Sequence, residues 1–112
     1  MRGRTNNRLY LIDFGLSQRF LKNGCHIPYA ENISIVGNLD FSSISQHLGI
    51  QVSRRDDIEA LAYILVYLLS GNLPWCDFQG DYYEISKKVL EAKISISSEE
   101  LCRNLPKCIN NL

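Results

Sequence analysis

The acid that follows the first apolar run has the clearest chemical potential in this chain. Asp13 comes directly after Leu9-Tyr10-Leu11-Ile12 and directly before Phe14-Gly15. Four apolar residues in a row predict a short buried strand, and the glycine predicts a turn behind it. A fixed strand end can aim a carboxylate at a metal ion, and such hard oxygen ligands suit magnesium. Asp13 is therefore a candidate metal ligand.

The cysteines and histidines show no ligand spacing. No C-x-x-C pair and no secretory signal accompany the four cysteines, which are Cys25, Cys76, Cys102 and Cys108. We expect reduced thiols, buried as small hydrophobic side chains, in an intracellular protein of the cytoplasm or nucleus. His26 and His47 lie far apart in sequence, so a zinc site is not predicted.

Composition bounds the class of protein and its partners. A chain of 112 residues with 46% hydrophobic content is at most one domain and is not disordered. The 12 basic and 12 acidic side chains cancel, so charge predicts neither a nucleic acid nor an anionic membrane as partner.

The elements that must position Asp13 are organised around the segment from Ser53 to Trp75. Between Ile58 and Leu69 only Glu59 is not apolar, which predicts a helix buried on all sides. These positions span only about 18 Å, too short for the hydrocarbon core of a membrane. Capping signals mark both helix ends: Ser53 with Asp56 at the start, and Gly71 with Pro74 at the end. The expected fold is mainly α, built around this one buried helix.

Asp57, one residue before the apolar run, allows two interpretations. It can be a solvated acid in the first turn, where the helix dipole favours negative charge. It can also be a half-buried acceptor that ties another backbone segment onto the helix. The residues alone leave both open.

The other segments predict a long loop and short helices. No apolar period survives from Leu16 to Asp40, and about 25 residues of loop are usually functional in a compact domain. Turn signals within it are Asn23-Gly24, Pro28 and Gly37-Asn38. Helices are expected over 42–48 (closed by Gly49), over 81–93, and from 98 until Pro106. Residues 1–8 are polar and basic, which indicates a tail.

A strand with Asp13-Phe14-Gly15, a long loop and an acid-headed apolar helix resemble, in this order, the C-terminal lobe of protein kinases. The short sequence motifs within this order resemble those of the casein kinase 1 family of serine/threonine kinases. The similar stretches are His26-Ile27-Pro28-Tyr29 with Glu31-Asn32, His47-Leu48-Gly49-Ile50, Ser53-Arg54-Arg55-Asp56-Asp57 and Leu73-Pro74-Trp75. The likeness runs from about Leu9 to Pro106, and residues 9–112 are expected to be a partial kinase domain.

The resemblance implies roles for five residues. Asp13 would hold the magnesium that bridges ATP phosphates, and Ile12 would line the floor of the adenine pocket. Gly37 and Asn38 match the loop that receives a protein substrate. Asp57 matches the acid that anchors the backbone of the catalytic loop. ATP and Mg²⁺ are thus the cofactors implied for the complete enzyme.

The resemblance also implies that parts of a kinase are missing. The glycine-rich loop, the ATP-binding lysine and the catalytic-loop aspartate lie upstream of Asp-Phe-Gly in the family, where only eight residues precede the expected strand here. We therefore expect a fragment without catalytic residues of its own, inactive alone and unable to hold ATP or Mg²⁺ tightly. Its partners would be protein substrates or the missing remainder of the domain. The alternatives are a non-catalytic, kinase-derived interaction module and a truncated product without function.

Three substitutions depart from the family. Asn38 replaces a usual threonine, although an amide can make similar hydrogen bonds. Asp40 replaces an arginine and Ile33 replaces a lysine. Since those two bases help to bind a phosphate already present on the family's substrates, the resemblance predicts that this anion site has lost its cations.

Overall fold

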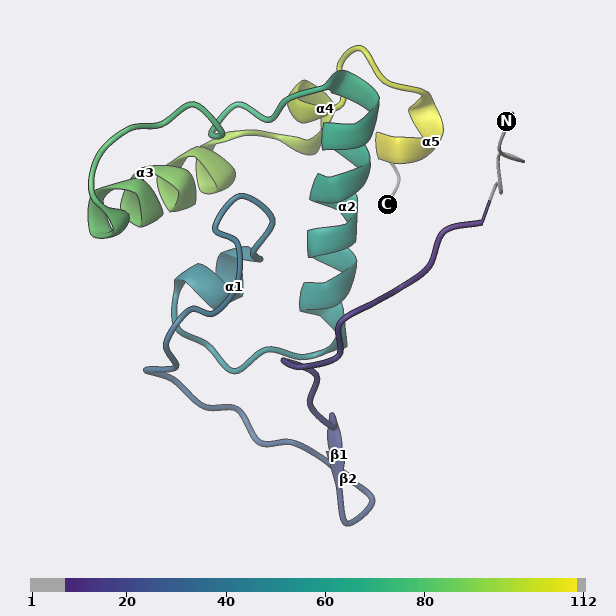
Figure 1. Cartoon of the computed structure of the whole chain (residues 1–112), viewed down its shortest axis with the longest axis vertical. Helices are drawn as coiled ribbons and strands as arrows, with labels where there is room; N and C mark the ends of the chain where they lie inside the picture. The colour runs from purple at the N-terminus through teal and green to yellow at the C-terminus, as the bar shows by residue number, and fades with distance from the viewer. Residues whose placement is uncertain (1–7, 111–112) are drawn as a thin grey trace, which may run out of the picture.

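The computed structural model describes residues 8–110 and is mainly helical, as predicted (Figure 1). Its elements are β1 (Leu21–Lys22), β2 (Cys25–His26), α1 (Ile44–His47), α2 (Arg54–Ser70), α3 (Tyr82–Ser95), α4 (Ser98–Leu101) and α5 (Lys107–Asn110). Helix α2 stands in the centre, with α1 and α3 together on one side of it and the hairpin of β1 and β2 near its first turn. Residues 1–7 of the expected tail lie outside the described residues.

The predicted ends of α2 are confirmed. The Asp56 carboxylate accepts the Ser53 amide through Oδ2 at 2.7 Å, as the capping box requires. At the other end Gly71 has φ of 82°, and its amide donates to the Tyr67 carbonyl at 2.8 Å. The left-handed conformation is one that glycine adopts without steric cost, so the helix ends where the sequence indicates.

The helices predicted over 42–48 and 81–93 are confirmed as α1 and α3. The helix predicted from 98 until Pro106 is shorter than expected, because α4 ends at Leu101, and α5 after Pro106 was not predicted. In the loop from 16 to 40, the Asn23-Gly24 turn is present with φ of 52° and 78°. It joins the two-residue strands β1 and β2 in an antiparallel hairpin that the sequence did not predict. None of the helices within residues 8–110 is long and apolar enough to cross a bilayer.

The hydrophobic core lies on one side of α2. Tyr63 and Val66 of this helix contact a cluster completed by Leu73, Trp75, Val89 and Cys102. The Trp75 ring meets the Tyr63 ring edge to face, with centroids 5.3 Å apart. This geometry is favourable for two aromatic quadrupoles, and it fastens the segment after Gly71 back onto the helix.

The prediction that α2 is buried on all sides is wrong. Its apolar residues on the side away from Tyr63 are exposed: Ile58, Leu61, Ile64, Leu68 and Leu69. We call these five residues the outer face of α2. Helices α1 and α3 lie on the core side of α2, and α5, on the other side, has only four residues and is too short to cover a 17-residue helix (Figure 1).

The expected buried strand over Leu9–Ile12 is not formed. The segment has no regular structure, and the side chains of Leu9 and Ile12 are 98% and 77% exposed. A strand must pair its backbone N–H and C=O groups with a neighbour, and the only strands within residues 8–110 pair with each other. The apolar run from Leu9 to Ile12 favours a strand, but within residues 8–110 no neighbouring strand pairs with it.

The four cysteines are unpaired, as predicted, but only Cys102 is buried. Cys25 and Cys108 are exposed and Cys76 is half-buried, so the expectation that all four fill the core is wrong. Cys25 is exposed because it belongs to the short hairpin, whose two strands have no layer packed over them.

Candidate functional site

Two of the sequence-predicted residues, Asp13 and Asp57, come together. Both line one cavity of about 330 Å³ between the segment after Ile12 and the first turn of α2. Arg54, in the same lining, places its guanidinium 4.2 Å from the centre of the Phe20 ring. Such a cation–π contact holds the loop against the helix. Residues 44 positions apart thus share a concave surface that carries two acids and one base.

Asp13 lies in a tight turn rather than at a strand end. Its φ is 62°, and its Oδ1 accepts the Gly15 amide at 3.2 Å. Asp and Asn tolerate this left-handed region because their side chains bond to nearby backbone groups. Ile12 is exposed and does not line the cavity. Its expected place under an adenine ring is therefore not seen and stays a prediction.

The donor set of the cavity fits magnesium only together with phosphate. Carboxylates such as those of Asp13 and Asp57 are the hard oxygen donors that Mg²⁺ takes, and phosphates and waters usually complete its shell. Within the part of the chain that the structure describes, no three His, Cys, Asp or Glu side chains gather as a metal cluster. The role that the resemblance gives Asp13, as a ligand of the Mg²⁺ that arrives with ATP, stays a prediction.

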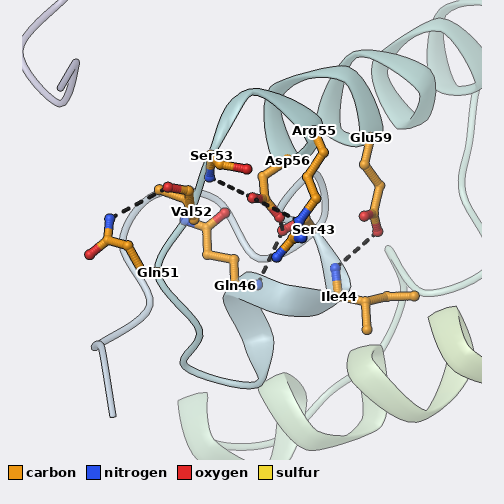
Figure 2. A network of polar contacts seen from close by, with 9 residues as sticks. All are labelled: Ser43, Ile44, Gln46, Gln51, Val52, Ser53, Arg55, Asp56 and Glu59. Atoms are coloured by element: carbon orange, nitrogen blue, oxygen red, sulfur yellow. Dashed lines mark hydrogen bonds and ion pairs between the residues drawn. The ribbon is translucent and has the colours of Figure 1, made fainter. Parts of the chain in front are cut away.

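Asp57 is exposed, and the acids that tie another segment onto α2 are its neighbours. Figure 2 shows Asp56, which is buried and accepts the Ser43 hydroxyl at 2.6 Å in addition to the Ser53 amide. Glu59 accepts the Ile44 amide at 2.9 Å. Both contacts hold α1 against α2. The role that the resemblance gives Asp57 concerns a catalytic loop that residues 8–110 do not include, so it stays a prediction.

Glu59 has a second partner in the core. The Tyr63 hydroxyl donates to the same Oε1 at 2.8 Å. Burial first, and this hydrogen bond second, raise the pKa of Tyr63. The one polar residue of the apolar run is therefore a connector between α1 and the core, which explains why it interrupts the run.

Gly37 and Asn38, the predicted substrate loop, begin a hydrogen-bonded turn over 37–42. Both are exposed, and Gly37 has φ of 95°. The Asn38 carbonyl accepts the Ser42 hydroxyl at 2.7 Å and the Ser42 amide at 3.1 Å. The Asn38 side chain accepts the Asp40 amide at 2.8 Å, so the amide that replaces a usual threonine is used to stabilise the turn itself.

Two distant side chains hold this turn from inside. Lys93 of α3 is buried, and its ammonium donates to the carbonyls of Leu39 and Ser42 at 2.8 and 2.6 Å. Trp75 donates from Nε1 to the Asp40 carbonyl at 2.9 Å. Burial lowers the pKa of Lys93 to about 8, which still leaves the ammonium charged at neutral pH.

Sequence reasoning missed Lys93 as a site residue, although a signal was present. Lys93 follows Ile85 and Val89 at intervals of four, so it lies on the apolar side of α3. A lysine on the buried side of a helix needs acceptors for its three donors. That requirement points to a backbone turn nearby, but only the tertiary structure says which one.

No protein-family model matches the chain. The likeness to the casein kinase 1 family therefore rests on the motifs and their order. In the structure, Asp13 and Asp57 line one cavity, and Trp75 and Lys93 donate hydrogen bonds to the 37–42 turn.

Proposed function

We propose that this chain is part of a casein kinase 1-like serine/threonine kinase and is inactive alone. In the complete enzyme the chain would contribute Asp13 for Mg²⁺–ATP, the 37–42 turn for a protein substrate and α2 as the central helix of the large lobe. The observation that carries the proposal is the cavity shared by Asp13 and Asp57, which unites the acid of the Asp-Phe-Gly segment with the acid that heads the central helix. The N-lobe and the catalytic loop would come from the rest of a longer polypeptide of which this chain is a part.

The amount of exposed surface supports the proposal that the rest of a kinase domain is missing. We call this missing part the complement. A compact protein of 12.8 kDa exposes about 6,300 Å², whereas this chain exposes 9178 Å². Its radius of gyration is 16.2 Å, against about 13 Å for a compact chain of this length. The excess of about 2,900 Å² is larger than the roughly 800 Å² that each partner buries in a standard interface. We propose that the missing remainder of the domain covers part of this surface, including the outer face of α2.

The isolated chain is expected to associate or to lack fixed packing, because a contiguous apolar surface well above a few hundred Å² promotes association. Light scattering and thermal unfolding test this. Fusing a casein kinase 1-like N-lobe and catalytic loop ahead of Leu9 should give a monomer with one cooperative transition. In the unfused chain, the double change Leu61→Lys and Leu68→Lys should reduce association, while Tyr83→Lys, at an exposed position of α3, should not. A monomeric, cooperatively folded unfused chain would disprove the need for a complement.

A non-catalytic interaction module is the second candidate function. The same outer face of α2 favours it, since that face offers apolar area without any catalytic group. The two candidates differ in what the fused protein does. A module would bind a partner through this face, but the fused protein would still transfer no phosphate.

The fused enzyme should have lost the family's preference for substrates that already carry a phosphate. Asp40 places an acid where a base would bind that phosphate, and Ile33 offers no charge. Two lost charge-assisted hydrogen bonds, each contributing about 1.5–3 kcal/mol, should weaken the preference at least tenfold. The measurement is the ratio of kcat/KM for peptides with and without an upstream phosphoserine.

Restoring Asp40→Arg and Ile33→Lys together should bring the preference back, more at low salt than at high. Asp40→Asn serves as the matched control, because it removes the repulsion without adding a base. A strong preference for the phosphopeptide before any restoration would show that other basic residues form the site.

A further inference from the structure

The ammonium of Lys93 uses all three of its donors. Two go to the Leu39 and Ser42 carbonyls, and the third lies 3.1 Å from Nε2 of His47. The rings of Tyr63 and Trp75 flank it, with centroids 4.9 and 5.2 Å away. A lysine ammonium has no acceptor atom, so this contact is a hydrogen bond only in the neutral tautomer of His47 that carries its proton on Nδ1 and its lone pair on Nε2. Lys93 can therefore hold the turn fully only while His47 is neutral.

A second proton on His47 would reverse the role of Nε2. Nε2 would become a donor directed at the Leu39 carbonyl, 3.2 Å away, which already receives Lys93. Two cations would then lie side by side in a half-buried site. Nδ1, on the other side of the ring, lies 3.5 Å from the Ser86 hydroxyl. This neutral group cannot offset the added positive charge as a carboxylate would.

The surroundings of His47, burial above all, favour its neutral form. Burial first and the charge of Lys93 second lower the pKa of His47 below 6.5, while the Leu39 carbonyl and Glu59 of α2 act in the opposite direction. Glu59, Asp40 of the turn and Cys76 favour the charged form of Lys93. The folded chain thus takes up the His47 proton at lower pH than the unfolded chain. Stability from this site is present above about pH 6.5 and is lost as pH falls through the folded pKa.

We propose that Lys93 and neutral His47 act as positioning residues for the 37–42 turn, and that protonation of His47 releases the turn in acid. Only the description of this turn as a substrate loop rests on the proposed function. The release would make substrate binding acid-sensitive through His47, which lies outside the 37–42 turn.

Hydrogen exchange tests the proposal at two amides, in the full chain or, if that chain associates or lacks fixed packing, in the fused protein described above. The Ser42 amide donates within the turn, and the Ser53 amide donates to Asp56 outside it. After correction for intrinsic exchange, protection of Ser42 should fall severalfold between pH 7.5 and pH 5, while protection of Ser53 stays. In His47→Gln, whose amide oxygen is an acceptor at any pH, Ser42 protection should not depend on pH. In Lys93→Met, protection of the Ser42 amide should be reduced about tenfold or more at both pH values, because the Leu39 and Ser42 carbonyls lose their donor.

Three results would overturn the proposal. One is an unprotected Ser42 amide at pH 7.5, and another is an acid response that persists in His47→Gln. The third is a parallel loss at Ser42 and Ser53, which would indicate general unfolding. These amides report on the turn whether or not a fused enzyme transfers phosphate, so this proposal and the proposed function fail separately.

Discussion

Replacing Trp75 with alanine is expected to lower the free energy of unfolding by about 3–5 kcal/mol, the usual range for deleting a large aromatic side chain from a packed core. Only 1% of Trp75 is exposed. Its ring packs against Tyr63, and its Nε1–H is the donor for the Asp40 carbonyl. The substitution therefore leaves a cavity and also a carbonyl without its partner.

Denaturant unfolding measures this loss, in the chain itself or, if the chain associates, in the fused protein described above. Tyr83→Ala is the matched control, because Tyr83 is 77% exposed on α3 and its removal should change stability by no more than about 0.5 kcal/mol. Trp75→Phe should fall between the two, since it keeps an apolar ring but removes the donor. Equal effects of Trp75→Ala and Tyr83→Ala would contradict the description of the core.

Local signals predicted local structure well. The caps of α2 at Ser53 and Gly71, and the turn at Asn23-Gly24, depend on a few adjacent residues and were all predicted from them. Capping and left-handed turns are decided by side chains and backbone within one helical turn or hairpin, so neighbours in sequence carry the information.

What the sequence could not supply is the identity of distant partners. An apolar run from Leu9 to Ile12 becomes a strand only beside another strand, and an apolar helix is buried only where other elements cover it. Both predictions assumed a partner that residues 8–110 do not provide. The same exposed groups are now the main argument for a complement.

In the site, too, the sequence does not say which partners a single side chain has. Successive helix residues point about 100° apart, so Asp56 faces inward and Asp57 outward although both are acids in the first turn. Composition alone could not distinguish them. Lys93 likewise depends on the Leu39 and Ser42 carbonyls, more than 50 positions away, for its three-way contact.

The largest expected effect concerns catalysis: the chain alone should transfer no phosphate from ATP, whereas the fused enzyme should. Phosphoryl transfer depends on positioning and electrostatic stabilisation of the phosphates, and the lysine, glycine-rich loop and catalytic aspartate that supply them would come with the added segment. Asp13→Asn should remove most of the activity of the fused enzyme, because the variant loses a charged ligand for Mg²⁺. Asp77→Asn, at an exposed acid outside the cavity, should leave the activity unchanged.

The most direct measurement is incorporation of labelled phosphate into casein from ATP and Mg²⁺, by the chain alone, by the fused enzyme and by the fused enzyme with Asp13→Asn. We predict incorporation by the fused enzyme only, at the background level in the other two. Incorporation by the chain alone, above the same chain with Asp13→Asn, would contradict the account. A folded, monomeric fused enzyme that incorporates no label would contradict it equally.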